Sequence, residues 1–430
     1  MEGGHARPAP PRDRVGGATG RPCSRRRFLG LAATAPLAVA AGCGGGGSPA
    51  GPSSSPSPSP AVVPPSSGSG VVALTRARSY GAEAAAAMRQ AFDLLGGIGS
   101  LVRDKTVTVK VNFTGWPIRG ISGRSAAETY VTHGDTALAL AQILSENGAR
   151  RIRFVESEGV ALPLEDIAAA AGWDVQALQA ISGVEFENTR NLGFGSSYAR
   201  LTVSDGGRLF SYLDVNHSYA DTDVFVSLCK MKEHATAAGI TLSMKNLFGI
   251  TPNALYGSEG AGEDKLGYRG PVHGKAEGWV RLLPGEKAGF ENEIVGVRVP
   301  RTIVDENLAR PVHLAIVDGV TTIRGGEGWW NAGVAPIDPG VIVAGFNALS
   351  TDAVAAAVMG FDARAAHYTA PFETRENHFL IAEQAGLGTA DVNRIEVRGL
   401  RIADVRTPFR SSSHRWEPTP TLGGPGGPIG

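Results

Sequence analysis

The chain has 430 residues, a hydrophobic content of 42% and a formal net charge of zero. Its length allows one large domain or two, and the lack of a basic excess argues against a nucleic-acid partner. The cysteines are Cys23, Cys43 and Cys229. Because only Cys229 falls in the expected folded body, the count excludes a disulfide framework there and a four-cysteine zinc or iron–sulfur site.

The first 43 residues are typical of an export signal. Ser24 to Gly30 reads SRRRFLG and resembles the twin-arginine motif, and the apolar stretch that follows is too short to span a bilayer. Val39 to Cys43 reads VAAGC and resembles a lipobox. We therefore expect export, with lipidation of Cys43 anchoring the protein to a membrane at the cell surface or facing the periplasm. Simple cleavage of the signal is the alternative.

Two segments outside the expected fold are predicted to be disordered. Residues 44–70 contain Gly, Ser, Pro, Ala and Val with no charge, and such a segment buries too little apolar surface to fold. Residues 409–430 turn to Ser, Pro and Gly and read as a tail. The folded body is therefore expected over residues 71–408.

The first third of the body alternates strand and helix patterns. The periodicity predicts strands at 71–74, 106–113 and 151–155, with helices between them at 82–95 and 133–144. This alternation favours a parallel sheet with covering helices.

The remainder of the body continues the pattern with a hairpin inserted. Strands are expected at 184–187, 199–203, 208–215, 223–228, 312–317, 341–344 and 394–397, and helices at 164–171, 236–247, 301–308, 351–359 and 376–385. Asp205 to Gly207 predicts a turn between two antiparallel strands. The expected fold class is α/β, mainly parallel, as a single large body that could have two lobes.

The stretch from Asp223 to Pro252 concentrates basic side chains in an apolar context. Lys230, Lys232 and His234 follow a buried strand on alternate positions, so in an extended chain they share one face. Lysines there could hold a phosphate or carboxylate, and His234 could act as an acid or base. Solvated lysines and a helix-capping histidine are the alternative.

Lys245 and Asn246 end the same stretch after an apolar run and are candidates for holding the ligand, with surface exposure as the alternative. Lys110 and Asn112 end an earlier strand. In open α/β sheets ligands bind beyond the carboxyl ends of strands, so we expect Lys110 and Asn112 to join the same site.

Other strand ends and loops carry further candidates. His133 precedes a helix and could bind an anion there or simply cap it. Asp318, and Glu327 in a Gly-rich loop, could supply an acid or a metal ligand, and Glu156 with Glu158 could hold magnesium or lie exposed. A divalent metal is thus left open.

Cys229 and Asp352 are given structural roles. Cys229 lies between apolar residues and is expected to be a buried inert thiol. Asp352, near a helix start, is expected to cap a helix or to offset its dipole.

The core stretch also resembles a known family. The segments DVFVSLCKMKEH and GITLSMKNLFGI, together with Lys110-Val111-Asn112, Thr132-His133, Ile316 to Gly319, Gly326 to Gly328, Asp352 and Gly386 to Gly388, are similar in order and kind to the family called domain of unknown function 362. The resemblance covers roughly residues 105–400. Some members of that family carry ferredoxin-type clusters in an added module; this chain lacks those cysteines, so no iron–sulfur cluster is expected.

These observations leave the function open between classes. One hypothesis is an exported enzyme acting on a small anionic substrate, with His234 as acid or base and Asp318 or Glu327 as its partner. A second is a tethered binding protein for an anionic solute or cofactor. A third is a scaffold with a polar core. Convergence of Lys230, His234, Lys245 and Asp318 would favour the first two.

Overall fold

The computed structural model describes residues 70–235, 237–275, 279, 281–289 and 295–410. The predicted export signal with Cys43, residues 44–69 of the linker and residues 411–430 of the tail lie outside these residues. Every described residue belongs to one unit, Pro58–Gly430. No helix within the described ranges combines the length and apolarity needed to cross a membrane.

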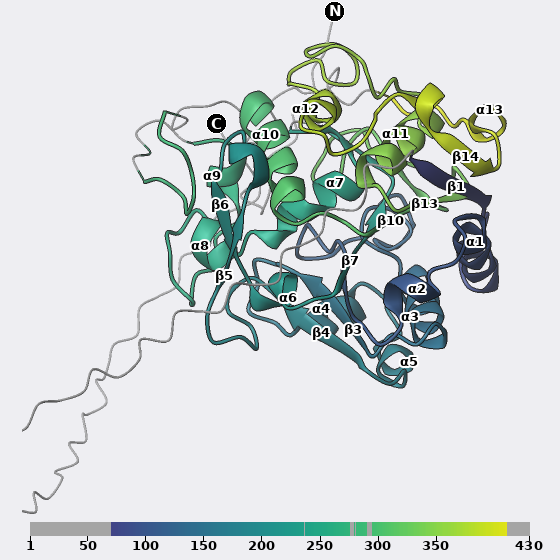
Figure 1. Cartoon of the computed structure of the whole chain (residues 1–430), viewed down its shortest axis with the longest axis horizontal. Helices are drawn as coiled ribbons and strands as arrows, with labels where there is room; N and C mark the ends of the chain where they lie inside the picture. Colours follow the sequence, from purple (N-terminus) through teal and green to yellow (C-terminus); the bar gives the residue numbers. More distant parts are fainter. Residues whose placement is uncertain (1–69, 236, 276–278, 280, 290–294, 411–430) are drawn as a thin grey trace, which may run out of the picture. The chain divides into compact units, whose positions relative to one another are not determined.

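A single eight-stranded sheet organises the described residues (Figure 1). Its spatial order is β14 (Glu396–Gly399), β1 (Val71–Arg76), β13 (Val341–Gly345), β10 (Leu314–Gly319), β7 (Val224–Lys230), β2 (Thr106–Lys110), β3 (Arg151–Glu156) and β4 (Val184–Asn188). Only β13 runs antiparallel to its neighbours β1 and β10; the other pairs are parallel. The predicted α/β class with a mainly parallel sheet is confirmed.

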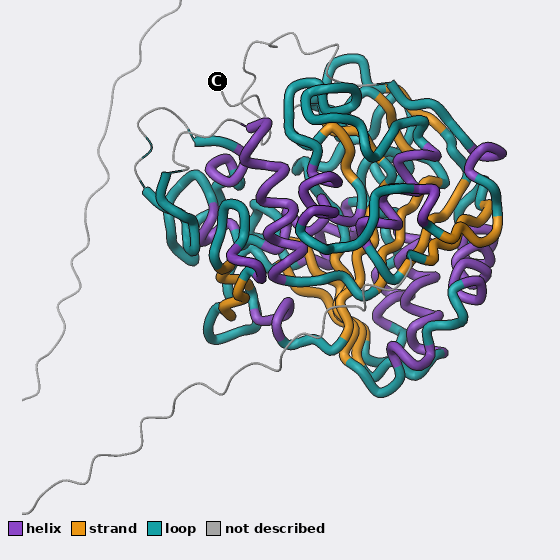
Figure 2. The backbone as a smooth tube through the Cα atoms, turned by 45° about the horizontal axis from the view of Figure 1, so that its top comes forward, coloured by secondary structure: helices purple, strands orange, loops and turns teal. Residues whose placement is uncertain are grey.

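The central strands β13, β10, β7 and β2 are buried on both faces, which explains the apolar runs of β13, β10 and β7. In β7, Val224, Val226 and Leu228 pack into one hydrophobic cluster, while Phe225 and Cys229 pack into the other. Helices α1 (Ala82–Leu94), α3 (Gly134–Glu146) and α4 (Leu164–Ala170) contribute to the first cluster, and α10 (Val295–Ala309) and α11 (Ala348–Val358) to the second. The sheet therefore has helices on both sides, as the tube in Figure 2 also shows.

Three two-stranded antiparallel sheets accompany the main sheet: β5 (Ala199–Thr202) with β6 (Tyr212–Val215), β8 (Lys232–His234) with β9 (Gly239–Thr241), and β11 (Thr322–Arg324) with β12 (Ala335–Ile337). The short helices are α2 (Gly99–Val102), α5 (Val175–Gln179), α6 (His217–Ala220), α7 (Ser243–Asn246), α8 (Asn253–Tyr256), α9 (Gly270–His273), α12 (His378–Gln384) and α13 (Ile402–Val405). Three 3-10 turns span Ser204–Gly206, Leu247–Ile250 and Val392–Arg394.

The helix expected over residues 236–247 is wrong in its first half. Gly239 has a φ of 74°, outside the helical region, and opens strand β9, which pairs with β8. The helix α7 begins only at Ser243. Tertiary pairing of the chain with Lys232–His234 thus overrides a local pattern that reads as helical.

The strand order places a topological switch point beside the candidate residues. From β2 the chain proceeds to β3 and β4 on one side of the sheet, whereas β7 and β10 lie on the other side of β2. Lys110 is the last residue of β2 and Lys230 the last residue of β7. In open α/β sheets, the crevice at such a point, beyond the carboxyl ends of the strands, is where ligands bind.

Candidate functional site

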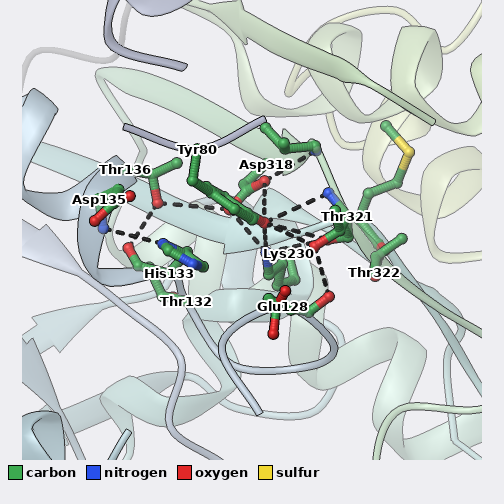
Figure 3. Close-up of polar contacts among 12 residues, drawn as sticks. Tyr80, Glu128, Thr132, His133, Asp135, Thr136, Lys230, Asp318, Thr321 and Thr322 are labelled. Atoms are coloured by element: carbon green, nitrogen blue, oxygen red, sulfur yellow. Dashed lines mark hydrogen bonds and ion pairs between the residues drawn. The ribbon is translucent and has the colours of Figure 1, made fainter. Parts of the chain in front are cut away.

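Lys230 lies in a closed ion pair at the ends of β7 and β10. Its Nζ is 2.9 Å from Asp318 Oδ2 and 3.1 Å from the carbonyl oxygen of Thr321, and it also donates to the hydroxyl of Tyr80 (Figure 3). Lys230 and Asp318 are both fully buried. Since an ammonium group has three N–H donors, these acceptors use all of them, and Lys230 has none left for a ligand.

Tyr80 and His133 cover this ion pair. Their rings stack with centroids 3.4 Å apart, and the Tyr80 hydroxyl lies 3.3 Å from Asp318 Oδ1 (Figure 3). Burial, followed by the charge of Asp318, raises the pKa of Tyr80. The sequence reading missed Tyr80, because it follows β1 without any neighbouring polar motif.

His133 performs the capping role that was the alternative at the sequence level. Its Nδ1 accepts a hydrogen bond from the Asp135 backbone N–H at 3.0 Å, at the start of α3. Burial, and next the charge of Lys230, lower the pKa of His133 to about 4. The imidazole is therefore neutral at physiological pH and occupied on Nδ1.

Lys110 is likewise paired. Its Nζ lies 2.7 Å from Glu156 Oε1 and 2.6 Å from the carbonyl oxygen of Val111, and both charged side chains are buried. A Cβ at Gly249 would lie 2.5 Å from Glu156 Oε1 and 2.7 Å from Lys110 Nζ, so only glycine fits against this pair. The backbone at Gly249 thus packs directly against the Lys110–Glu156 pair.

The two candidate amides hold the backbone in place. Asn112 Nδ2 donates to the carbonyl oxygen of Tyr130 at 2.9 Å. Asn246 Nδ2 donates to the carbonyl oxygen of Lys110 at 2.9 Å and to Ser227 Oγ at 3.0 Å. Both side chains tie loops to strand ends, which keeps the end of β2 and helix α7 together.

Lys232, two residues after Lys230, is held by hydrogen bonds to backbone carbonyl oxygens. Its Nζ donates to Tyr130 O at 2.7 Å and to Glu327 O at 3.4 Å. Burial lowers its pKa to about 8, and the nearby charge of Glu327 partly opposes this. Lys232 remains cationic below that pH without a hydrogen-bonded carboxylate.

Glu327 is oriented by its loop. Its Oε2 accepts from the backbone N–H of Ala235 at 2.8 Å, and its Oε1 accepts from Trp330 Nε1 at 3.0 Å. A Cβ at Gly328 would lie 2.2 Å from the Trp330 ring. The glycine after Glu327 therefore lets the indole fold back onto the carboxylate, a close approach only the fold reveals.

His234 is neutral and presents an N–H. Its Nδ1 accepts the Ala237 backbone N–H at 3.2 Å and lies 3.6 Å from Glu327 Oε2. Burial, followed by the charges of Lys245 and Arg375, lowers its pKa well below the usual value. Because Nδ1 is an acceptor, the single imidazole proton is on Nε2, which makes His234 a hydrogen-bond donor to any bound group.

Lys245 differs from the other three candidate lysines, Lys110, Lys230 and Lys232. Its Nζ lies 3.6 Å from the centroid of the Phe248 ring, and no oxygen in the described ranges accepts a hydrogen bond from it. Burial lowers its pKa to about 7, although the charge of Glu306 opposes the shift.

Asp352 from α11 holds the start of α7, the helix that carries Lys245. Its carboxylate accepts hydrogen bonds from the backbone N–H groups of Ser243 at 2.9 Å and Met244 at 2.8 Å.

Three further polar side chains interact electrostatically with Lys245: Glu306, His273 and His378. We call these three residues, together with Lys245 and His234, the Lys245 cluster. Glu306 is fully buried, and neither carboxylate oxygen has a hydrogen-bond partner in the described part of the chain. Burial raises its pKa to about 8. The charge of Lys245 contributes, after burial, to lowering the pKa values of His273 and His378 to about 3.

The histidines of the cluster offer different atoms. His273 Nδ1 donates to the carbonyl oxygen of Arg269 at 2.8 Å, so its Nε2 carries a lone pair. His378 Nδ1 is buried without a partner among the described residues. The cluster thus combines one N–H donor, one imidazole lone pair, and the side chains of Lys245 and Glu306, which have no hydrogen-bond partner among the described residues.

Sequence patterns could have found part of this set. Val299, Ile303 and Glu306 lie four and three residues apart, so Glu306 falls on the buried stripe of α10. A charged residue on an apolar stripe is an informative exception. His273 lies in a long Gly-rich loop and His378 in a short helix far along the chain, and neither carries such a signal.

Comparison with known proteins agrees with the motifs. Residues 107–357 match the family model described as Domain of unknown function (DUF362). The chain belongs to this family. Lys110, Lys230, Lys245 and Glu306 lie within the matched DUF362 segment, whereas Tyr80 and His378 lie outside it.

A curated relative shares part of this DUF362 chain. The protein named "Thylakoid-associated protein sll1697" from Synechocystis sp. is 27% identical over 266 residues, which are 59% of this chain and 64% of the relative. The chain thus matches somewhat less than two thirds of that protein's length.

The predicted site residues of this DUF362 member coincide with neither a metal-type cluster nor one of two cavities in the described residues. Over the described ranges, no group of three or more His, Cys, Asp or Glu side chains is placed to hold a metal ion. One cavity of about 30 Å³ lies beside Met244, Asn307 and Leu349, and one of about 510 Å³ lies along Ser211 to Asp214 and Arg281 to Glu286. Neither is lined by a predicted site residue.

The predicted convergence is therefore divided. Lys230 and Asp318 pair directly with each other. His234 and Lys245 belong to the Lys245 cluster, and the charge of Lys232 contributes to lowering the pKa of each of them. Cys229 is buried, and burial raises its thiol pKa, as expected for an inert cysteine.

Proposed function

We propose that the Lys245 cluster binds a small anion. The observation that supports this is the contrast among the four lysines that were candidates from the sequence, all of which are buried. Lys110 and Lys230 have carboxylate partners and Lys232 has two carbonyl acceptors, whereas Lys245 has no acceptor among the described residues. A buried charge without a partner is costly, and an anion is the simplest partner to supply.

The charges around Lys245 favour an anion over a cation. Glu306, the carboxyl whose charge has the largest effect on the pKa of Lys245, has its own pKa raised to about 8 by burial and is mainly protonated at neutral pH. The charges of Arg269 and Lys232 lower the pKa of Lys245 and that of Glu327 raises it, so two of these three ionised groups are positive. The Nε2–H of His234 adds a neutral donor. Together these groups match the acceptor oxygens of a carboxylate or phosphate.

We also propose that His234 gives its Nε2–H to the ligand, which narrows the acid or base role expected from sequence to a donor. Glu327 positions this histidine and its loop, because both carboxylate oxygens already accept hydrogen bonds. Asp318 neutralises Lys230 and acts at a distance from the ligand. A binding protein and an enzyme both fit this arrangement, and catalysis requires a further argument, made below.

Calorimetry on the purified full-length chain tests the binding proposal. Oxalate, phosphate and sulfate are titrated into wild type, Lys245→Met and Lys105→Met, where Lys105 is an exposed lysine. We expect at least one anion to bind, with affinity reduced about tenfold or more, a loss of roughly 1.4 kcal/mol, in Lys245→Met alone. Equal affinity in wild type and Lys245→Met would contradict the proposal.

Binding should also take up protons. An anion beside Lys245 favours its charged form and raises a pKa that is about 7 in the free protein. Near pH 7.5 the wild type should therefore bind protons together with the anion, detected as a heat that depends on the ionisation enthalpy of the buffer. Lys245→Met should lose this uptake; uptake that persists in the variant would point to another group.

We further propose that the chain is exported and held at a membrane through Cys43. The support is the twin-arginine and lipobox-like sequence, together with the name of the relative, which is described as thylakoid-associated. Cys43 lies outside the described residues. Fractionation of cells that express wild type and Cys43→Ser tests this, because the variant should move from the membrane to the soluble fraction.

A further inference from the structure

Lys245 combines three features that are uncommon for a lysine. Its Nζ has no hydrogen-bond acceptor in the described residues, it packs 3.6 Å from the centroid of an aromatic ring, and 9% of the residue remains exposed. A lysine that is desolvated and surrounded by other cationic groups becomes a nucleophile, because its neutral form is populated near pH 7. The pKa of about 7 agrees with this geometry.

Glu306 has the complementary feature. Both of its oxygens are buried without partners within the described ranges, and its pKa of about 8 makes it a carboxylic acid at neutral pH. It lies on α10, whose Asn307 donates to the carbonyl oxygen of Met244 at 3.1 Å and so ties α10 to the helix that carries Lys245. A neutral amine and a neutral acid therefore lie in adjoining elements.

We propose that Lys245 is a nucleophile that forms an imine with the carbonyl group of a small anionic carbonyl compound of the 2-oxo acid class. The proposal rests on the anion-binding function above and deepens it. In a 2-oxo acid the carbonyl adjoins the carboxylate, so one small molecule supplies both the electrophile and the anion. The carboxylate fits the field of Arg269 and Lys232 and the Nε2–H of His234.

The chemistry balances without an oxidant or a reductant. The Nζ lone pair attacks the carbonyl carbon, a C–N bond forms, and the C=O π electrons move to the oxygen, which takes a proton. The C–O bond then breaks, the oxygen leaves as water with two hydrogens, and nitrogen, having lost two hydrogens, forms the C=N bond. One amine proton passes to the oxygen as the carbinolamine forms. Glu306 then protonates the leaving hydroxyl, and the resulting carboxylate takes back the last proton from nitrogen.

The small exposed area of the cluster favours a small substrate. Lys245 and His234 each expose 9% of their surface, and Glu306 is fully buried. A two- or three-carbon oxo acid such as glyoxylate or pyruvate suits such a site, whereas a large substrate does not.

Reductive trapping on the full-length protein tests the proposal without any mutation. Wild type is incubated at pH 7.5 with glyoxylate and cyanoborohydride, and the modified lysine is located by peptide mass spectrometry. At this pH, a lysine of pKa about 7 is mainly neutral, while an ordinary lysine of pKa ~10.4 is neutral in roughly one molecule per thousand. After allowing for weaker intrinsic nucleophilicity, with a Brønsted coefficient of ~0.5, the advantage is roughly tenfold.

We expect the Lys245 peptide to be modified about tenfold faster than the peptide containing exposed Lys105. Glu306→Gln keeps the side-chain volume and should slow trapping at Lys245 while leaving the rate at Lys105 unchanged. Acetaldehyde, which lacks the anionic group, should react with Lys245 much more slowly than glyoxylate, and oxalate should protect Lys245. Equal rates with acetaldehyde and glyoxylate would overturn the substrate class.

The outcomes separate this inference from the proposed function. If oxalate binds in a manner that depends on Lys245 but glyoxylate leaves no adduct on Lys245, the imine chemistry is refuted and anion binding stands. If oxalate, phosphate and sulfate all fail to bind and no adduct forms, both are refuted. An adduct on Lys245 that oxalate prevents supports both.

Discussion

The pairing of Lys230 with Asp318 predicts a large loss of stability when the carboxylate is removed. The perturbation is Asp318→Asn, which keeps the shape of the side chain and deletes its charge. Both residues are fully buried, and Nζ lies 2.9 Å from Oδ2. In the variant, Lys230 would have a buried charge and only neutral acceptors, the Tyr80 hydroxyl and the Thr321 carbonyl.

The expected magnitude follows from the burial. Removing one partner of a buried pair costs about 3–5 kcal/mol, and the two neutral acceptors with the Asn oxygen favour the lower end, about 3 kcal/mol. Since whole domains are stable by about 5–15 kcal/mol, this is a large fraction of the total. Removing both charges with Lys230→Met and Asp318→Leu should restore most of the loss, because no unpaired charge remains.

Urea unfolding followed by tryptophan fluorescence is the assay, since the chain contains six tryptophans. Glu146→Gln is the matched control: Glu146 pairs with Arg89 at the surface, where both side chains are about half exposed. An exposed pair contributes about 0–1 kcal/mol, so this control should unfold close to wild type.

One result would refute the reasoning. If Asp318→Asn has wild-type stability within about 0.5 kcal/mol but loses oxalate binding, Asp318 belongs to the ligand site and the ion pair does not stabilise the fold. A double variant less stable than Asp318→Asn would also contradict an account in which the unpaired lysine carries the cost.

Three further predictions follow from the same site. Lys245→Met should be more stable than wild type below pH 7, by up to roughly 4 kcal/mol, and this advantage should vanish by about pH 10, because between pH 7 and ~10.4 only the unfolded wild type binds the lysine proton; a pH-independent difference in urea unfolding would contradict it. Asp352→Ala removes the acceptor of two N–H groups at the start of α7 and should cost about 1–2 kcal/mol while weakening oxalate binding, whereas unchanged affinity would mean that α7 keeps its position without this cap. Gly328→Ala places a Cβ 2.2 Å from the Trp330 ring and should cost about 1–3 kcal/mol, with red-shifted tryptophan emission; wild-type emission and stability would show that the indole is free to move.

Much of the fold was predictable because its signals are local. The buried strands β7 and β10 are mainly apolar runs, β2 alternates valine with threonine, and α1 and α3 have a clear helical period. The strand–helix alternation predicts a mainly parallel sheet. The prediction of a helix from residue 236 was wrong because β9 pairs with β8 in an antiparallel sheet. That tertiary contact decides the conformation of the segment.

The candidate site was predictable only as a set of residue types. Alternation predicts that Lys230, Lys232 and His234 are close together, and their placement after β7 predicts the carboxyl edge of the sheet. It does not distinguish a lysine that has partners from one that has none. Lys230 contacts Asp318 and Tyr80, and both are far from it in the sequence. Its role therefore depends on contacts that no local pattern encodes.

The amino-acid sequence by itself determined the fold class, the family and the strand ends at which charged residues gather, because apolar periodicity and motif order are properties of the chain. Only the tertiary structure decided which charges neutralise each other. Lys110 and Lys230 pair with carboxylates from neighbouring strands, while Lys245 packs against Phe248 and has no carboxylate partner among the described residues. The physical reason is that burial sets the cost of a charge and the partners set whether that cost is met, and both depend on segments brought together from distant parts of the chain.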